Sequence, residues 1–214
     1  MHRADIVARI VHERIVAVLR LDDPANAGAV VDALVAGGVR VIEVTMTVPK
    51  AIELIAELAK AHSTDVLIGA GTVVDTGTAA RAIDAGAKFV VSPVFRPAVM
   101  AECHRLGLPA FPGCFTPTEI LNAWDAGADI VKVFPATGLS PTYFRDILAP
   151  LPQLKLMPTG GVSIDNAAGW LRAGAVAVGI GSALVDAAAV RSGDLAAITR
   201  NATRLVASVH EVSG

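Results

Sequence analysis

The stretch Ala-Gly-Ala-Asp-Ile-Val-Lys-Val-Phe-Pro (126–135) contains the pattern from which the fold can be inferred. A glycine just past a helix supplies the left-handed turn that ends the helix. The short apolar run after it is rich in β-branched residues, which is typical of a strand buried in a parallel sheet. The stretch therefore predicts a helix, a glycine turn and a buried strand, in that order.

The same phrase returns along the chain, each time between a helix-like stretch and an apolar run. The other copies are Ala36-Gly37-Gly38, Ala85-Gly86-Ala87, Leu106-Gly107-Leu108 and Ala173-Gly174-Ala175. Regular alternation of helices and strands indicates βαβ units and a parallel sheet. We expect eight strands, at about 15–20, 39–45, 66–71, 89–92, 109–113, 130–134, 154–159 and 175–181.

Eight strand–helix units in a chain of this length predict an α/β fold of the (β/α)8 TIM barrel type, with an extra N-terminal helix at residues 2–13. The structural alternative is an open, doubly wound sheet. No GxGxxG follows the first strand, which argues against a dinucleotide site of the Rossmann kind.

Length, charge and hydrophobic content indicate which classes of protein the chain can belong to. The chain has 214 residues, a net charge of −2 and 53% hydrophobic residues, which suits a single domain spanning 1–214. The near-neutral charge predicts no binding to nucleic acid or to a membrane surface, and no apolar run approaches the roughly 20 residues that span a bilayer. No signal-peptide core opens the chain, so the cytoplasm is the expected location. The charged fraction of 18% favours a further buried surface between subunits.

Lys132 lies inside the buried strand of the opening stretch. An ammonium group is costly to remove from water, so a lysine there needs a reason. Burial disfavours the charged form of an amine, and a neutral amine attacks carbonyl groups. A Schiff-base role is therefore the leading hypothesis. The alternatives are a side chain that reaches solvent from the strand end, or one paired with a carboxylate.

Glu43 belongs to the second predicted strand, where alternation places Val41, Glu43 and Thr45 on one face. In a barrel the second and sixth strands lie opposite each other, so Glu43 and Lys132 can meet near the axis. A buried carboxyl group beside an amine can serve as an acid–base and nucleophile set. The alternative is a structural ion pair between the two.

Small residues and glycines follow the last two predicted strands, in Pro158-Thr159-Gly160-Gly161 and Gly179-Ile180-Gly181-Ser182. Exposed backbone N–H groups at that end of a barrel form its usual phosphate site, so we expect a phosphate or another anion there. The five histidines are scattered and none pairs at ligand spacing, so no metal is expected. Cys114 lies near the barrel mouth without a histidine beside it, which favours a buried thiol over a nucleophile.

The strand-end motifs, in this order, resemble those of the class I aldolases that act on 2-keto-3-deoxy-6-phosphogluconate (KDPG) and 2-keto-4-hydroxyglutarate (KHG). The resemblance covers about Ile15 to Leu184. Its carriers are Gly37-Gly38-Val39-Arg40-Val41-Ile42-Glu43-Val44-Thr45, Ile68-Gly69-Ala70-Gly71-Thr72-Val73, Val91-Ser92-Pro93, Pro112-Gly113, Val131-Lys132-Val133-Phe134-Pro135-Ala136, Pro158-Thr159-Gly160-Gly161-Val162 and Gly179-Ile180-Gly181-Ser182-Ala183-Leu184.

The resemblance implies a role for each matching position. Lys132 would form the Schiff base and Glu43 would be the general acid and base, acting directly or through water. Thr72 and Pro93 would hold the pyruvate part, with Phe134 beside it. The distal end and its phosphate would be surrounded by Thr159, Gly160, Gly161, Gly181 and Ser182. The family works without a metal or other cofactor and is typically a homotrimer.

One position departs from the pattern. Many members carry an arginine two residues after the threonine of the second-strand motif, where it binds the substrate's carboxylate. Here that substrate-binding position is Thr47, in Thr45-Met46-Thr47-Val48-Pro49. Arg20, at the end of the first predicted strand, could supply the missing cation. The alternative for Arg20 is a structural pair with Asp22 or Asp23.

These observations predict a Schiff-base aldolase, a lyase that reversibly cleaves KDPG to pyruvate and glyceraldehyde 3-phosphate. KHG, cleaved to pyruvate and glyoxylate, is a second expected substrate. One rival is a phosphosugar isomerase or epimerase on the same barrel, with Glu43 as base and Lys132 as a charged partner. The other is a non-catalytic trimeric assembly or binding protein, for which Thr47 is the one hint.

Overall fold

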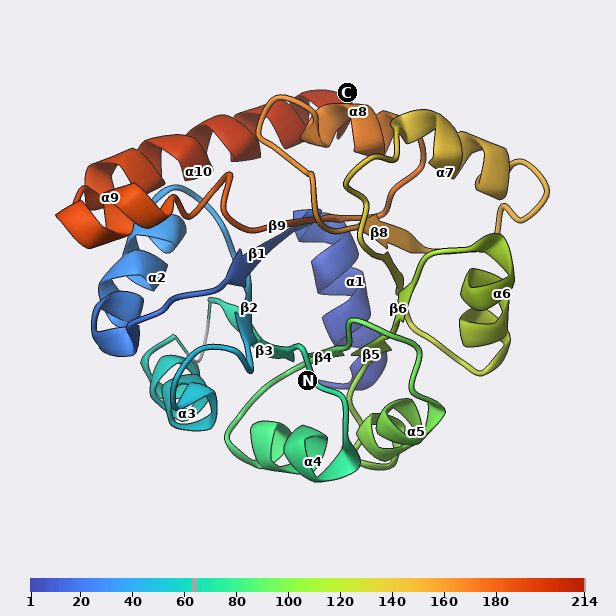
Figure 1. Ribbon diagram of the computed structural model, residues 1–214, viewed down its shortest axis with the longest axis horizontal. Helices are drawn as coiled ribbons and strands as arrows, with labels where there is room; N and C mark the ends of the chain where they lie inside the picture. Colours follow the sequence, from blue (N-terminus) through green and yellow to red (C-terminus); the bar gives the residue numbers. More distant parts are fainter. Residues whose placement is uncertain (63–64, 214) are drawn as a thin grey trace.

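The computed structural model describes residues 1–62 and 65–213 and has an α/β architecture, with short parallel strands in the interior and helices outside them (Figure 1). The strands are β1 (Ile15–Leu19), β2 (Val41–Thr45), β3 (Leu67–Gly71), β4 (Val90–Val91), β5 (Ala110–Phe111), β6 (Gly113–Cys114), β7 (Val131–Val133), β8 (Leu156–Pro158) and β9 (Val178–Ile180). The helices are α1 (Arg3–Glu13), α2 (Ala27–Ala36), α3 (Ala51–Ala61), α4 (Thr76–Asp84), α5 (Pro97–Arg105), α6 (Pro117–Asp125), α7 (Pro141–Leu148), α8 (Ala167–Arg172), α9 (Ala187–Ser192) and α10 (Leu195–His210), with 3-10 turns η1 (Pro24–Asn26) and η2 (Glu211–Ser213).

The strands form two sheets. One has the order β5-β4-β3-β2-β1-β9 and the other the order β6-β7-β8. Every strand pairing is parallel, and the last register pair of β1 and β2 is Leu19 with Val44. Between the sheets, a parallel bridge joins Thr159 to Gly179, and the N–H of Val176 donates to the carbonyl of Leu156 at 2.9 Å.

The expectation of one strand over 109–113 is wrong. That segment forms two strands, β5 and β6, separated by Pro112, so the described residues hold nine strands rather than eight. Proline has no N–H to continue the ladder, and the chain changes partners there, from β4 to β7. The carbonyl of Pro112 accepts the N–H of Lys132 at 2.9 Å. Gly113 permits a close approach, because a Cβ there would lie 2.3 Å from the carbonyl of Pro93.

The glycine turns between helices and strands are confirmed. Each of the five phrases contains a glycine with positive φ, at Gly38, Gly86, Gly107, Gly127 and Gly174. In the first phrase the left-handed residue is the second glycine. The first, Gly37, packs so closely on α10 that a Cβ would lie 2.3 Å from Cβ of Ala202.

Helices with an apolar face bury that face in the core, whereas the short helix α9 has no buried residue. In α10 the buried positions are Ile198, Ala202, Leu205 and Val209, spaced at three or four residues. The side chain of Asp194 caps the start of this helix by accepting the N–H of Ala197. Within the described ranges, no helix has both the length and the apolar character needed to cross a membrane.

Alternation along the strands divides the core into two layers. Outward side chains such as Ile42, Val44, Val131 and Val133 pack against the helices. Inward side chains form a second cluster, which the buried side chains of α1 join. Its members are Ile6, Val7, Ile10, Val16, Val41, Leu67, Phe89, Val91, Phe111, Ile130, Met157 and Ala177. Because Val41 and Ile130 face inward, period two also turns Glu43 and Lys132 inward.

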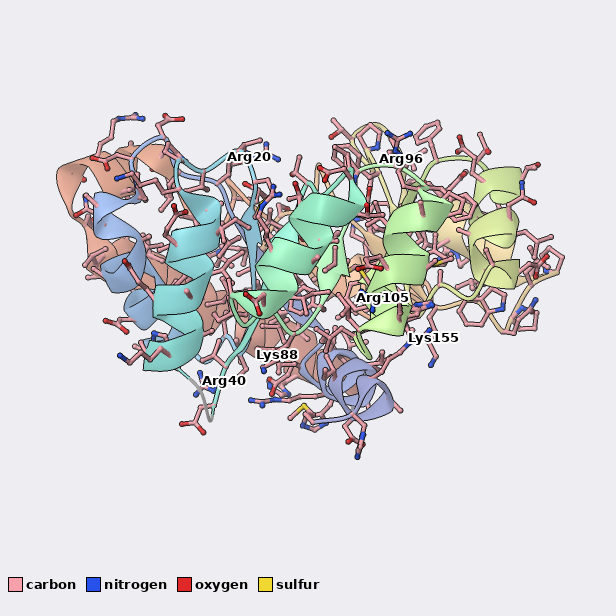
Figure 2. All side chains as sticks on the ribbon, turned by 90° about the horizontal axis from the view of Figure 1, so that it is seen from below. Arg20, Arg40, Lys88, Arg96, Arg105 and Lys155 are labelled. Atoms are coloured by element: carbon pink, nitrogen blue, oxygen red, sulfur yellow. The ribbon has the colours of Figure 1, made fainter. Side chains whose placement is uncertain are left out.

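α1 lies within the ring of strands in Figure 1 and at one end of the molecule in Figure 2. Arg20 and Arg96 mark the opposite end, where the carboxyl ends of the strands lie, while Lys88 and Lys155 lie toward α1. Lys155 is exposed and directly precedes β8. α1 therefore fills one end of the interior and leaves the other end open.

A buried carboxylate ties α1 to the strands. Asp129, whose side chain is 10% exposed, accepts Nε of Arg3 at 2.7 Å and the N–H of Ala110 at 3.0 Å, and lies 3.2 Å from Nε2 of His104. This one side chain therefore joins α1, α5, the first residue of β5 and the segment before β7.

Asp129→Ala should lower the free energy of unfolding by about 2–3 kcal/mol, because it leaves the Ala110 N–H and the Arg3 guanidinium without their acceptor. The matched control is Glu102→Ala, which removes an exposed pair with Arg105 and should change stability little. The free energies of unfolding of both variants are measured by urea unfolding. Equal losses would contradict the role assigned to Asp129.

Candidate active site

Lys132 is the middle residue of β7 and is almost fully enclosed, with 7% of its side chain exposed. In the register it faces Gly113 on one side and Met157 on the other. Its Nζ lies 3.8 Å from Oε1 of Glu43 and 5.1 Å from the centre of the Phe134 ring. The predicted meeting of Lys132 with Glu43 is confirmed, and Lys132 does not reach solvent as a lysine at a strand end would.

Glu43 is 1% exposed, and neither carboxylate oxygen has a hydrogen-bond partner among the described residues. The distance of 3.8 Å to Lys132 is an ion-pair contact but is too long for a hydrogen bond. A carboxyl group kept only for stability would gain more from hydrogen bonds to its free lone pairs. Its oxygens are left available to a ligand.

Glycines on β3 create the space that Glu43 occupies. The inward positions of this strand are Leu67, Gly69 and Gly71. A Cβ at Gly71 would lie 2.0 Å from Oε1 of Glu43, and one at Gly69 would lie 2.4 Å from the ring of Phe89. β3 thus has no side chains at these two inward positions, and Glu43 and Phe89 occupy the space. The signal for this role was present in Gly69-Ala70-Gly71, although sequence analysis assigned it no function.

A cavity of about 370 Å³ opens at the carboxyl ends of β1, β8 and β9. Seven of the predicted site residues line it: Arg20, Phe134, Thr159, Gly160, Gly161, Gly181 and Ser182. Phe134 connects this cavity with Lys132. The hydroxyl of Thr159 is buried and has no partner from the described part of the chain. Asp22 and Gly179 also line the cavity and were not foreseen as site residues.

Backbone geometry adapts the loop after β8 to this cavity. Gly160 and Gly161 have φ of +86° and +73°, a region that favours glycine. A Cβ at Gly161 would lie 2.9 Å from Cα of Thr137. A loop of this kind presents backbone N–H groups and suits an anion.

Arg20 is exposed and directly follows β1. No ion pair joins its guanidinium to Asp22 or Asp23 in the residues that the structure describes. Asp23 instead caps η1 by accepting the N–H of Ala25 at 2.9 Å. The arrangement leaves Arg20 available to an anion in the cavity.

Three predicted residues lie at the ends of β2, β3 and β4 and do not line the cavity. Thr72 follows β3 with a φ of 61°, an uncommon value for a threonine. Pro93 is half-buried after β4. Thr47 is exposed, and its hydroxyl oxygen lies 2.8 Å from that of Thr45.

Cys114 is buried at the end of β6, and burial raises the pKa of its thiol to about 12, with the Glu119 carboxylate adding to the effect. The thiol is therefore protonated at neutral pH, which agrees with a buried structural side chain rather than a nucleophile.

A family model described as KDPG and KHG aldolase matches residues 6–201 of the chain. The chain belongs to this aldolase family. It is therefore a lyase, and the predicted enzyme class is confirmed.

Two relatives match most of the chain. The 2-dehydro-3-deoxy-phosphogluconate aldolase of Treponema pallidum is 38% identical over 187 residues, 87% of this chain and 89% of the relative. A probable 2-dehydro-3-deoxy-6-phosphogalactonate aldolase of Rhizobium meliloti is 39% identical over 171 residues, 79% of this chain and 81% of the relative. A solved structure of KDPG aldolase from Legionella pneumophila, with pyruvate captured at low pH as a covalent carbinolamine intermediate, has a TM-score of 0.85 and 28% identity. The match covers 93% of this chain and 97% of that one.

Gly71→Ala should displace the Glu43 carboxyl, because the new methyl group would occupy the position of Oε1. We expect a loss of about 1–3 kcal/mol in stability and at least a tenfold loss of aldolase turnover. Gly28→Ala is the matched control, since no atom lies within 4 Å of a Cβ there. Urea unfolding and turnover are measured for both, and normal turnover in Gly71→Ala would contradict the tight packing of Glu43.

Proposed function

We propose that this enzyme is a class I aldolase that reversibly cleaves KDPG to pyruvate and glyceraldehyde 3-phosphate, with KHG as a second substrate cleaved to pyruvate and glyoxylate. The observation that carries the proposal is the 3.8 Å approach of the Lys132 amine to the Glu43 carboxyl, whose oxygens have no hydrogen-bond partner among the described residues. An amine and a carboxyl group enclosed together supply the nucleophile and the proton carrier that imine chemistry needs.

The reaction begins when the neutral amine of Lys132 attacks the C2 ketone of the bound sugar acid. Glu43 donates a proton to the carbinolamine hydroxyl, which leaves as water, so that a protonated imine and the Glu43 carboxylate remain. Glu43 takes the proton of the C4 hydroxyl as the C3–C4 bond breaks, and the electron pair of that bond moves toward the imine nitrogen. The products of this step are the aldehyde and an enamine. Glu43 returns the proton to C3, and water hydrolyses the resulting imine to pyruvate and free Lys132.

Enclosure of both groups explains how protons can move at low cost. A charge created alone in this interior would be strongly disfavoured. When a proton passes between Lys132 and Glu43, the pair changes between a neutral and a doubly charged form without leaving a single uncompensated charge. Each protonation state that the reaction needs is then accessible in the same site.

The remaining site residues divide between the two ends of the substrate. Thr72, Pro93 and Phe134 hold the pyruvate part, and Thr47 belongs to the same side. The phosphate lies in the 370 Å³ cavity, where Arg20 supplies a cation. The rest of its surroundings are Thr159, Gly160, Gly161, Gly181 and Ser182. The backbone N–H groups of these loops donate to phosphate oxygens.

Incubation with pyruvate and borohydride, followed by intact mass and peptide mapping, tests the covalent step. A pyruvyl-sized adduct on Lys132 is expected, and Lys132→Ala should give neither adduct nor cleavage while remaining folded. A folded sample without an adduct would favour the isomerase or epimerase, in which Lys132 stays a charged amine, or a protein without turnover. Glu43→Gln should still form the adduct but turn over roughly 10²–10⁴-fold more slowly.

We also propose that residues 1–214 form one domain in which the two sheets complete a (β/α)8 barrel, with α1 across its lower end. Pro112 joins β5 to β6 without a loop, and the bridge from Thr159 to Gly179 joins β8 to β9.

Cys103 and Cys114 are buried free thiols, which suits a reducing compartment, and we place the enzyme in the cytoplasm.

The enzyme is further proposed to be a homotrimer. Three large apolar side chains, Val74, Val94 and Phe115, are 41%, 48% and 43% exposed. They follow β3, β4 and β6 and so lie at the same end of the molecule as the site. Apolar side chains gathered at one end of a structure are typical of a surface that another copy covers.

Phe115→Glu should shift the protein from trimer to smaller species, because it places a charge in the proposed interface. The mass in solution, measured by light scattering after size-exclusion chromatography, gives the result. Ala207→Glu, at an exposed position of α10, is the control and should leave the mass unchanged. A monomeric parent protein would overturn the trimer, and a trimeric Phe115→Glu would exclude this surface.

A further inference from the structure

Two hydroxyl groups at the end of β2 form a short chain of hydrogen bonds. Oγ1 of Thr45 lies 3.2 Å from the carbonyl oxygen of Leu19 and 2.8 Å from Oγ1 of Thr47. A carbonyl oxygen can only accept, so the single proton of Thr45 goes to Leu19. The contact between the two threonines must then use the proton of Thr47. Thr45 is 1% exposed, so its hydroxyl is shielded from solvent.

The direction of these two hydrogen bonds determines whether Thr47 can donate or accept a hydrogen bond with a ligand. Its single proton is used on Thr45, so its hydroxyl presents only lone pairs to the open end of the site. A carboxylate or phosphate needs hydrogen-bond donors. Thr47 therefore does not take over the anion-binding task of an arginine by direct contact while the chain of hydroxyls is intact.

The carbonyl at the other end of the chain belongs to the peptide that leads into Arg20. Leu19 is the last residue of β1 and the last with a register partner in β2. Arg20 lines two neighbouring cavities, the inner one of about 370 Å³ and an outer one of about 340 Å³ that continues to Arg191. The orientation of the peptide between Leu19 and Arg20 decides from where the guanidinium enters the inner cavity.

We propose that Thr47 is a positioning residue, which through Thr45 holds the Leu19 carbonyl and so directs Arg20 toward the anionic substrate. This inference rests on the proposed function and on Arg20 as its anion-binding cation. The residue found where many relatives of this family carry an arginine thus acts through the arginine of the adjacent strand. Figure 2 places Arg20 at the end of the molecule opposite α1.

A double-mutant cycle tests the proposal with KDPG as the probe. Thr47→Val keeps the shape of the side chain and removes the hydroxyl, and Arg20→Met removes the cation. Thr47→Val should raise KM about five- to tenfold with kcat changed less than about twofold, because the lost interaction positions a binding group. In the Arg20→Met background the same change should alter KM less than about twofold, since coupled residues are not additive.

Two further variants separate positioning from general disturbance. Thr47→Ser keeps the hydroxyl and should retain the parent KM. Thr203→Val removes an exposed hydroxyl that donates to the Thr199 carbonyl in α10, and should leave all kinetics unchanged. The inhibition constant of inorganic phosphate against KDPG should rise in Thr47→Val by the same factor as KM. If Thr47→Val folds poorly, Thr47→Ala replaces it in the cycle.

The outcomes separate this inference from the proposed function. Turnover of KDPG by the parent enzyme and an adduct on Lys132 establish the function before any Thr47 variant is measured. An unchanged KM in Thr47→Val overturns the positioning role. An equal rise of KM in both backgrounds also overturns it, because Thr47 would then act on the substrate independently of Arg20.

Discussion

The Glu43 carboxyl and the Lys132 amine face each other across 3.8 Å inside a ring of apolar strands, and the rest of the site depends on this contact. Each group alone would be costly to enclose. Together they are a poor source of stability, because the distance is long and no described residue satisfies the carboxylate oxygens. The cost of burying these oxygens without partners is offset only when a ligand donates hydrogen bonds to them. The interior therefore encloses an amine and a carboxyl group, and the carboxyl oxygens lack hydrogen-bond partners among the described residues.

Apolar packing and polar contacts at the end of the molecule occupied by α1 stabilise the fold that holds this site. α1 adds Ile6, Val7 and Ile10 to the inward apolar cluster, directly below the polar layer. Asp129, just before β7, connects this helix with α5 and β5 through three polar contacts. Packed side chains close the interior at the α1 end, and the cavity opens at the opposite end. Packing thus occupies one end of the strands and the candidate site the other, a division that is usual in proteins with parallel α/β barrels.

Glycines on the inward faces determine how much room the polar layer has. Gly71 accommodates the Glu43 carboxyl, and Gly179 accommodates Thr159, whose Oγ1 would lie 2.3 Å from a Cβ at that position. Any larger residue at either place would push a site residue off its position. Threonine hydroxyls then connect neighbouring strand ends, as Thr45 does between β2 and β1. Specific positions for the reacting groups arise from these close fits more than from charge.

Local patterns in the sequence determined much of this protein: the glycine turns, the strand and helix alternation, and the inward faces of Glu43 and Lys132 all follow from periods of two and 3.6 residues. The unusual cost of a lysine in an apolar strand also led to the prediction that Lys132 is the reactive amine. Tertiary structure decided the rest. The break at Pro112 depends on which strands lie beside it. Whether Arg20 forms an ion pair with Asp22 or Asp23 depends on distances that the local sequence does not specify. The direction of the Thr47 proton depends on a carbonyl 28 residues earlier in the chain, and such long-range hydrogen bonds exist only once the strands are side by side.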